Sequence, residues 1–264
     1  MKPEAPRLKT TTIKIAGIDL ELFESGHGPP LLFLHGGQGF NPDQPFVAPL
    51  AGRRRLVVPS HPGFGKSSLP DWLDSVDDIA HLYLELLDRL DIVSVDVVGC
   101  SIGGWIAAEM ATKVPERIRR LVMVGPVGVK VGAPDKLDIP DIFAMPQDEA
   151  TKLLFHDPAR MKPDIARMSD EELTAMVRSR ETLALLTWEP WMHNPKLKYR
   201  LHRAGMPALF VRGESDGLVS ADYMQAYARL LPRSRTAVIG AAGHAPHLEQ
   251  PQAFTSTVLA FLEE

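Results

Sequence analysis

The sequence is poor in the features that mark secreted or membrane proteins. Its 264 residues include one cysteine, Cys100, so no internal disulfide bond can form and a reducing compartment is indicated. The start of the chain, residues 1–9, is charged and contains proline, and it lacks the apolar segment of a secretory signal. No uninterrupted apolar stretch is long enough to cross a bilayer. We therefore expect a cytoplasmic protein with no membrane partner.

Excess charge of one sign is lacking as well. The formal net charge is −4 and the isoelectric point is near 6.1, so nothing favours nucleic acid or an anionic membrane as a partner. Repeats and low-complexity tracts are absent from the sequence. The length fits a single large α/β domain with a sizeable core. A small molecule is the expected partner, and the composition leaves the oligomeric state open.

What the chain does contain is a serine in the motif Gly99-Cys100-Ser101-Ile102-Gly103. A β-branched run, residues 94–99, precedes the serine, and a helix-forming stretch, residues 105–112, follows it. This context is typical of a nucleophile elbow, in which a strained turn presents a serine hydroxyl at a helix N-terminus. A helix-capping serine is the structural alternative. We interpret the neighbouring Cys100 as a small buried hydrophobic residue.

The same pattern occurs a second time, at Gly213-Glu214-Ser215-Asp216-Gly217. Ser215 follows a strand-like run over residues 208–212, but the residues directly after it read as a loop. Ser220 is then expected to cap a helix over residues 221–231. Because the elbow needs a helix directly behind the serine, Ser101 is the favoured nucleophile.

A serine nucleophile also needs a general base. Residues 235–240 read as the last core strand, and His244 follows on a short loop, ahead of a closing helix that we expect from Glu249 onward. This position makes His244 the candidate base.

The base in turn needs an acid that orients it, placed just past a core strand. Asp216 follows the strand over residues 208–212 and fits this position, although Asp-Gly is also a common turn. Glu214 is the local competitor and is expected to point the other way. The loop after residues 120–125 offers no carboxylate until Asp135, so Asp216 is the candidate acid.

An oxyanion site is expected after an early buried strand, residues 31–34. The loop that follows is His35-Gly36-Gly37-Gln38-Gly39. Backbone without side chains lets N–H groups approach a developing oxyanion, so we expect the amides of Gly37 and Ile102 to stabilise it. We interpret His35 as a structural buried histidine. Gln38 is either a plain loop residue or a contact to substrate.

Taken together and in this order, the motifs resemble those of the α/β-hydrolase family. The resemblance implies an eight-stranded, mostly parallel sheet with helices on both faces, and a Ser-His-Asp triad at the C-terminal ends of the strands. His61 stands where the family usually has an aspartate, at a position that is commonly structural. The match covers nearly the whole chain, through His35-Gly36-Gly37, Pro62-Gly63-Phe64-Gly65-Lys66-Ser67, residues 99–104, residues 213–216 and Gly243-His244.

Strand and helix signals alternate over the first half of the chain. Residues 11–24 are rich in strand signals, residues 56–59 read as a buried strand, and residues 76–90 keep helical spacing. This alternation favours a parallel, doubly wound sheet.

Residues 126–202 break the alternation, because no central strand is visible and helices are expected near residues 147–154 and 170–187. The resemblance implies a helical cap over the active site at this insertion point. We therefore predict a core formed by residues 1–125 and 203–264, with residues 126–202 as a cap within one continuous domain.

Bulky apolar side chains of this segment either pack the cap or line an apolar pocket. Trp188 and Trp191 are the candidate substrate contacts among them. The full set is Met161, Met168, Met176, Trp188, Trp191 and Met192.

Two further patterns carry no site. Gly65-Lys66-Ser67 looks like the end of a phosphate-binding loop, but Ser60 occupies the place of the first glycine of that motif. His244 and His247, with Glu249, lack the spacing of a metal-ligand cluster. We expect neither a metal nor a cofactor.

The favoured function is a serine hydrolase that cleaves a carboxylic ester, or a similarly activated carbonyl, with an apolar body. The resemblance leaves an alternative, the carbon–carbon bond hydrolases of aromatic catabolism, which usually carry Asn before the serine and Trp after the histidine. Cys100 and Ala245 occupy those positions here. A ligand-binding member of the fold without catalysis is a third possibility, and the complete set of catalytic residues argues against it.

Overall fold

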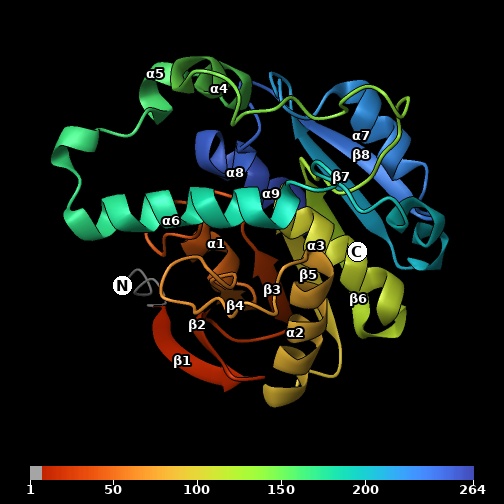
Figure 1. The fold of residues 1–264 in the computed structure, drawn as a ribbon. Coiled ribbons are helices and arrows are strands. Elements are labelled where there is room, and N and C mark those ends of the chain that lie inside the picture. The colour runs from red at the N-terminus through yellow and green to blue at the C-terminus, as the bar shows by residue number, and fades with distance from the viewer. Residues whose placement is uncertain (1–7) are drawn as a thin grey trace.

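The computed structural model describes residues 8–264, so residues 1–7, on which part of the expectation about targeting rests, lie outside it. Figure 1 shows a central sheet with helices on both faces. The strands are β1 (Lys9–Ile15), β2 (Ile18–Ser25), β3 (Pro30–Leu34), β4 (Arg55–Pro59), β5 (Val95–Cys100), β6 (Ile118–Val124), β7 (Ala208–Gly213) and β8 (Ser234–Ile239). The α-helices are α1 (Val47–Ala51), α2 (Val76–Arg89), α3 (Ile102–Lys113), α4 (Gln147–Leu154), α5 (Pro158–Met161), α6 (Asp170–Thr187), α7 (Ala221–Ala228), α8 (Pro246–Glu249) and α9 (Pro251–Leu262). Short 3-10 helices are η1 (Pro115–Arg117), η2 (Ile165–Arg167), η3 (Leu197–Tyr199) and η4 (Leu201–Arg203).

The sheet of the described residues has eight strands in the order β1-β2-β4-β3-β5-β6-β7-β8. β1 pairs antiparallel with β2, and β2 pairs antiparallel with β4, whereas the pairs from β4 to β8 are all parallel. The predicted eight-stranded, mostly parallel sheet is confirmed. Parallel strands end at one edge of a sheet, so the loops after β3, β5, β6, β7 and β8 meet at that edge.

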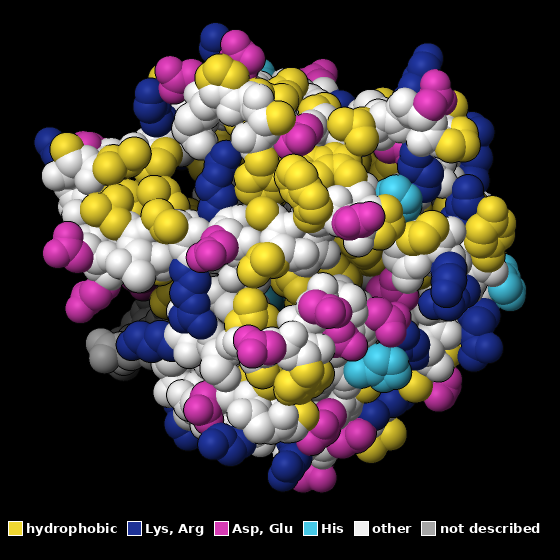
Figure 2. Space-filling model, in the orientation of Figure 1, with side chains coloured by type: hydrophobic (Ala, Val, Ile, Leu, Met, Phe, Trp, Pro, Cys, Tyr) yellow, Lys and Arg dark blue, Asp and Glu magenta, His cyan; other side chains and the backbone are white. Residues whose placement is uncertain are grey.

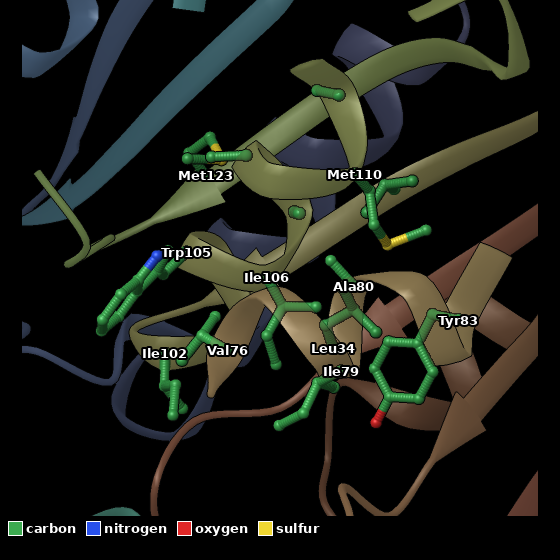
Figure 3. Packing of buried hydrophobic residues seen from close by; sticks show 14 of the residues in the cluster. Leu34, Val76, Ile79, Ala80, Tyr83, Ile102, Trp105, Ile106, Met110 and Met123 are labelled. Atoms are coloured by element: carbon green, nitrogen blue, oxygen red, sulfur yellow. The ribbon is translucent and has the colours of Figure 1, made fainter. Parts of the chain in front are cut away.

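Helices cover the sheet in two layers. α2, α3 and α7 bury their apolar sides against one face, and α1 and α9 bury theirs against the other. In Figure 3, Ile102 and Ile106 of α3 lie beside Val76 and Ile79 of α2. Full burial of one such side chain stabilises the fold by about 1.5–3 kcal/mol. This packing holds α3, the helix that begins directly after Ser101, firmly in place.

Between β6 and β7 the chain leaves the sheet, and Figure 1 shows α6 crossing the molecule in this segment. The helices predicted over residues 147–154 and 170–187 are confirmed with the same bounds. At the start of α6, Glu172 N–H donates to Ser169 Oγ at 3.3 Å, and Ser169 N–H donates to the Glu172 carboxylate at 2.8 Å. This reciprocal cap is a local signal, so the sequence alone locates the helix start.

The outer side of the same segment is partly apolar. Figure 2 shows hydrophobic side chains gathered over the part of the surface where α5 and α6 lie. The large exposed hydrophobic residues of this segment are Leu137, Ile165, Met176, Val177, Leu185, Trp188 and Tyr199.

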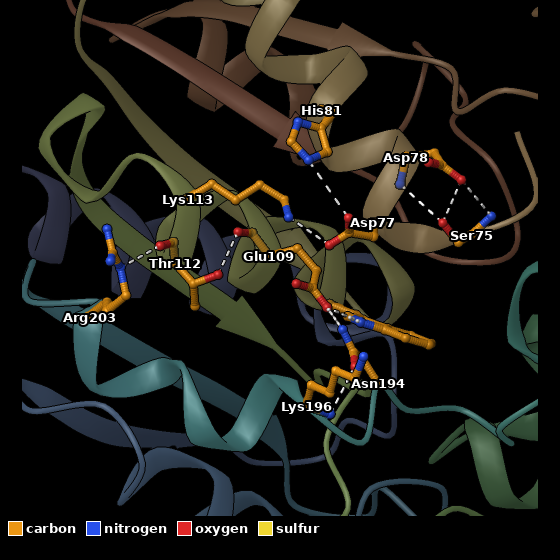
Figure 4. Close-up of polar contacts among 11 residues, drawn as sticks. Ser75, Asp77, Asp78, His81, Glu109, Thr112, Lys113, Asn194, Lys196 and Arg203 are labelled. Atoms are coloured by element: carbon orange, nitrogen blue, oxygen red, sulfur yellow. Dashed lines mark hydrogen bonds and ion pairs between the residues drawn. The ribbon is translucent and has the colours of Figure 1, made fainter.

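Buried polar contacts join the end of the segment to α3. Glu109 of α3, which is 0% exposed, accepts hydrogen bonds from Trp105 Nε1 at 3.2 Å and Asn194 Nδ2 at 2.7 Å (Figure 4). Burial raises the pKa of the Glu109 carboxyl group. Nearby, Arg203 Nε donates to the carbonyl oxygen of Thr112 at 2.9 Å. The chain that returns to β7 therefore packs closely on the helix behind Ser101.

Two helix boundaries differ from the prediction. α7 ends at Ala228 rather than near residue 231, because Leu231 N–H donates to the carbonyl of Ala228, three residues back, and tightens the last turn. The closing helix, expected from Glu249 onward, is α9 and begins at Pro251, whereas Glu249 ends the short helix α8. Pro251 has no N–H and is suited to the first position of a helix. In the described part of the chain, no helix combines the length and the apolar character of a membrane span.

Candidate active site

Ser101 lies in a strained turn between β5 and α3. Its backbone has φ 53° and ψ −115°, a region that residues with a side chain rarely adopt and that costs about 1–3 kcal/mol. The Ser101 N–H donates to the carbonyl of Val124 at 2.9 Å, which holds the turn against the end of β6. A methyl group on Gly103 would lie 2.2 Å from the carbonyl oxygen of Leu34, so only glycine fits there. The turn predicted for this motif is confirmed.

His244 and Asp216 form a buried pair on the neighbouring loops. His244 Nδ1 lies 3.0 Å from Asp216 Oδ2, and the Asp216 side chain is 0% exposed. The other carboxylate oxygen, Oδ1, accepts the N–H groups of Leu218 and Val219, each at 2.9 Å. Because the carboxylate accepts from Nδ1–H, the unprotonated nitrogen of a neutral imidazole is Nε2. His244 Nε2 is buried and has no hydrogen-bond partner among the described residues.

Gly125, at the end of β6, brings this pair next to the nucleophile strand. Its φ is +49°, and a methyl group there would lie 3.0 Å from the His244 ring and 3.2 Å from Asp216 Oδ2. The preceding residue, Val124, accepts the Ser101 N–H. The sequence analysis did not identify Gly125 as part of the site. Its position directly after β6, the neighbour of the strand that precedes Ser101, could have indicated a place where only a glycine fits.

The predicted oxyanion loop lies against Ser101. A methyl group on Gly36 would be 3.5 Å from the Cβ of Ser101, and Gly37 is the next residue. The Ile102 N–H is the first of α3, and the first N–H groups of a helix have no acceptor within it. Gly39 N–H donates to the Gly36 carbonyl at 3.1 Å and closes a tight turn, on which Gln38 is exposed.

α6 covers this loop. The Cδ2 atom of Leu183 would be 2.5 Å from a methyl group on Gly37, and Thr182 Oγ1 donates to the carbonyl of Gly63 at 3.1 Å. Leu183 was not among the predicted substrate contacts. Its contact with Gly37 joins residues far apart in the sequence, and no local pattern reports such a contact.

α4 meets the two loops that hold the acid and the base. Gly217 N–H donates to the carbonyl of Leu153 at 2.9 Å, and His244 N–H donates to the carbonyl of Leu154 at 2.7 Å. Glu249, 6% exposed, accepts the N–H of Gly243 at 2.6 Å with Oε2 and that of His156 at 2.8 Å with Oε1. The segment after β6 is therefore hydrogen-bonded directly to the candidate site.

The two tryptophans contact other residues of their own segment. Trp188 is 60% exposed. Trp191 donates from Nε1 to the carbonyl of Ile139 at 2.8 Å, and its ring lies edge-on to those of Phe143 and Trp188. These positions support packing within the segment, and a role in substrate binding stays a prediction for both residues.

The competing residues of the second motif lie at the surface. Ser215 Oγ is 2.8 Å from His156 Nδ1 in an exposed position. Glu214 is exposed, and its Oε2 accepts the N–H of Ala241 at 3.4 Å rather than approaching His244. Cys100 is 2% exposed within the core, and burial raises the pKa of its thiol. Its interpretation as a small buried hydrophobic residue is confirmed.

His247 lies in α8 and is largely covered by protein. Its ring contacts those of Phe33, Phe46 and Phe254. Burial, with a smaller contribution from His244, lowers its pKa to about 3. Within residues 8–264, no group of three or more His, Cys, Asp or Glu side chains has the arrangement of a metal site.

The sequence profile of the Alpha/beta hydrolase family matches residues 31–257, so the chain belongs to this family. It is 30% identical to a 2-hydroxymuconate semialdehyde hydrolase of Pseudomonas sp. (strain CF600), over 94% of this chain and 92% of that protein. It is 28% identical to a pimeloyl-[acyl-carrier protein] methyl ester esterase of Nitrosomonas europaea, over 92% of this chain and 98% of that protein. A solved meta-cleavage product hydrolase of Pseudomonas fluorescens IP01 superposes with a TM-score of 0.81 and 20% identity, over 96% of this chain and 97% of that one. The chain is a hydrolase of this family.

Proposed function

We propose that this hydrolase uses Ser101 as nucleophile and cleaves carboxylic esters with a small apolar or aromatic acyl group. One observation carries the proposal. Asp216 holds Nδ1 of His244, while Nε2 is buried without a partner among the described residues, at the sheet edge where Ser101 occupies a strained turn. An orienting acid, a base and a presented hydroxyl are the parts that acyl transfer to serine requires.

The reaction follows from these positions. Ser101 Oγ attacks the carbonyl carbon as His244 Nε2 accepts its proton, and Asp216 stabilises the imidazolium that forms. The N–H groups of Gly37 and Ile102 donate to the oxyanion, and one such donor contributes about 10²–10³ in rate. His244 then protonates the leaving alcohol. Water attacks the acyl-enzyme with His244 as base, which releases the acid and restores Ser101.

Residues 126–202 act in this proposal as a cap that shapes the acyl site. The support is the contact of Leu183 with Gly37 and the hydrogen bonds from Gly217 and His244 to the C-terminal end of α4. Leu183 presents an apolar surface next to the proposed oxyanion donor, which favours an apolar acyl group.

Ester cleavage is favoured over carbon–carbon cleavage by the partners of the arginines on α6. The substrates named for two relatives, 2-hydroxymuconate semialdehyde and 2-hydroxy-6-oxo-2,4-heptadienoate, each carry a carboxylate. A guanidinium is the usual partner of a carboxylate. Arg178 already donates to the carbonyls of Gly65 at 3.1 Å and Ser67 at 2.5 Å. Arg180 donates to Gln147 Oε1 at 3.1 Å and lies over the ring of Phe143.

Carbon–carbon bond hydrolysis is the second candidate, because the relative that is 30% identical carries that kind of name. A direct comparison of p-nitrophenyl butyrate with 2-hydroxymuconate semialdehyde decides between the two. We expect kcat/KM to be higher for the ester by roughly 10²-fold. A higher kcat/KM for the semialdehyde would overturn the ester proposal in favour of the second candidate.

The nucleophile is tested with Ser101→Ala and with Ser215→Ala as its matched control. We expect Ser101→Ala to lower kcat by about 10⁴–10⁶, and a fluorophosphonate to label the wild type and Ser215→Ala but not Ser101→Ala. Labelling and activity that survive in Ser101→Ala would remove Ser101 from this role. A wild type that is neither labelled nor active on either substrate would favour the ligand-binding alternative.

A further inference from the structure

Three buried side chains behind the oxyanion loop form one continuous set of hydrogen bonds. They are His35 on the loop, His61 after β4 and Tyr83 on α2, exposed by 2%, 0% and 0%. The Tyr83 hydroxyl lies 2.5 Å from His61 Nδ1, and His61 Nε2 lies 2.9 Å from the carbonyl oxygen of His35. His61 N–H donates to His35 Nε2 at 3.0 Å, and His35 Nδ1 lies 2.7 Å from the carbonyl oxygen of Gly36.

Only one arrangement of protons satisfies all of these contacts. His35 Nε2 accepts the His61 N–H, so the proton of this imidazole sits on Nδ1 and is donated to Gly36. A carbonyl oxygen cannot donate, so His61 Nε2–H donates to His35, and His61 Nδ1 accepts the Tyr83 hydroxyl. Burial lowers the pKa of His35 to about 4 and that of His61 well below its usual value, which keeps both rings neutral near pH 7.

The last hydrogen bond of the set acts on the oxyanion donor itself. The carbonyl of Gly36 and the N–H of Gly37 belong to the same planar peptide unit, so a donor that holds one group determines the direction of the other. Both residues are glycines, which lack the side chain that would limit rotation of this unit. His35 Nδ1–H and Gly39 N–H both donate to the Gly36 carbonyl and supply the missing restraint.

The ring positions keep the set rigid. The His35 and His61 rings stack with centroids 3.7 Å apart, and Phe64 meets both of them edge-on. Tyr83 belongs to the packed layer of α2 shown in Figure 3. Helix α2 is in this way connected to the peptide unit that carries Gly37 N–H.

We propose that His35, His61 and Tyr83 are positioning residues that aim the Gly37 N–H at the oxyanion of the transition state. This inference rests on the proposed function of the site. It assigns a task to His61, which replaces the aspartate that the family usually has at this position. Because the N–H group is aimed at charge that develops only during reaction, the set acts on kcat rather than on KM.

The test uses Tyr83→Phe, His61→Leu and His61→Gln, with p-nitrophenyl butyrate as substrate and butylboronic acid as a mimic of the tetrahedral intermediate. Tyr83→Phe removes one donor and is expected to lower kcat about tenfold. His61→Leu removes a donor and an acceptor and is expected to lower kcat about 10²-fold. His61→Gln retains both functions on its amide and is expected to stay within about threefold of the wild type. Affinity for the boronic acid should fall in parallel with kcat, while KM stays within about twofold.

Tyr223→Phe is the matched control. The Tyr223 hydroxyl donates to the carbonyl of Val129 at 3.0 Å and makes no contact with the three residues of this set, so its loss should lower the free energy of unfolding and leave kcat unchanged. A folded Tyr83→Phe variant with unchanged kcat and boronic acid affinity would overturn the inference, as would a His61→Gln variant as impaired as His61→Leu. Failure of this inference can be distinguished from failure of the proposed function. If Ser101 is not the nucleophile, activity or fluorophosphonate labelling will persist in Ser101→Ala.

Discussion

The loops at the edge of the sheet and the helical segment above them are built in different ways. Asp216 and His244 are held by backbone hydrogen bonds of 2.7–2.9 Å, and glycines stand where a methyl group would collide. In the segment above, in contrast, Val177 and Leu185 of α6 and Trp188 directly after it are 60–64% exposed. The edge leaves little freedom to the residues to which we assign the chemistry, whereas the segment leaves many positions free to vary. We infer that the first region determines the reaction and the second the choice of substrate.

The largest expected effect in the first region comes from Asp216→Asn. The amide cannot support the imidazolium or hold the required tautomer of His244, so kcat should fall by about 10⁴. Glu214→Gln is the control, since Glu214 is exposed and contacts Ala241, and its kcat should match the wild type. Steady-state kinetics on p-nitrophenyl butyrate measures both. The reverse order of effects would make Glu214 the acid.

Gly125→Ala tests whether the close packing of this region matters for rate. The new methyl group would lie 3.0 Å from the His244 ring, and a displacement of the imidazole by about 1 Å should lower kcat about 10²-fold. Gly17→Ala is the matched control, because Gly17 also has a positive φ, +83°, but has nothing within 4 Å of its Cβ position. It should lose stability and keep kcat. Equal kcat for the two variants would show that the contact with His244 does not govern the rate.

The buried histidines of the first region should make its stability depend on pH. The pKa of His247 is lowered to about 3, so between that value and its ordinary pKa the unfolded chain binds a proton that the folded chain does not. The free energy of unfolding should therefore fall as the pH drops from about 6.5 toward 3, by a few kcal/mol in all. His247→Phe, placed among three phenylalanine rings, should reduce this slope in urea titrations at several pH values. An unchanged slope would assign the acid sensitivity to other groups.

The smallest effects are expected in the second region, where Leu183→Ala should change preference rather than rate. Removing its methyl groups from Gly37 enlarges the acyl site, and each additional buried methylene is worth about 0.8 kcal/mol, or roughly fourfold in kcat/KM. The optimum among p-nitrophenyl acetate to octanoate should move to longer chains. Trp188→Ala and Trp191→Ala should move it less, because one ring is exposed and the other packs on Phe143. A larger shift in either tryptophan variant would support the prediction, made from the sequence, that this tryptophan contacts the substrate.

Local signals account for what could be read in advance. The start of α6 was predictable because Ser169 and Glu172 form its cap within one turn. The turn at Ser101 was predictable because Gly99 and Gly103 flank the serine between a strand signal and a helix signal. Asp216 and His244 were predictable because each follows a strand whose hydrophobic pattern is visible in the chain. These features depend on interactions between residues only a few positions apart.

The sequence by itself determined the succession of strands and helices along the chain, the candidate triad and the position of the glycine-rich loop. Each of these follows from local hydrogen bonding or from local steric limits. The tertiary structure alone decided that Leu183 covers Gly37, that Gly125 lies against the His244–Asp216 pair, and that Tyr83 reaches the loop of His35 and Gly36 through His61. These contacts join residues that only the packing of helices on the sheet brings together. Their partners lie far apart along the chain, so no periodicity or motif records them.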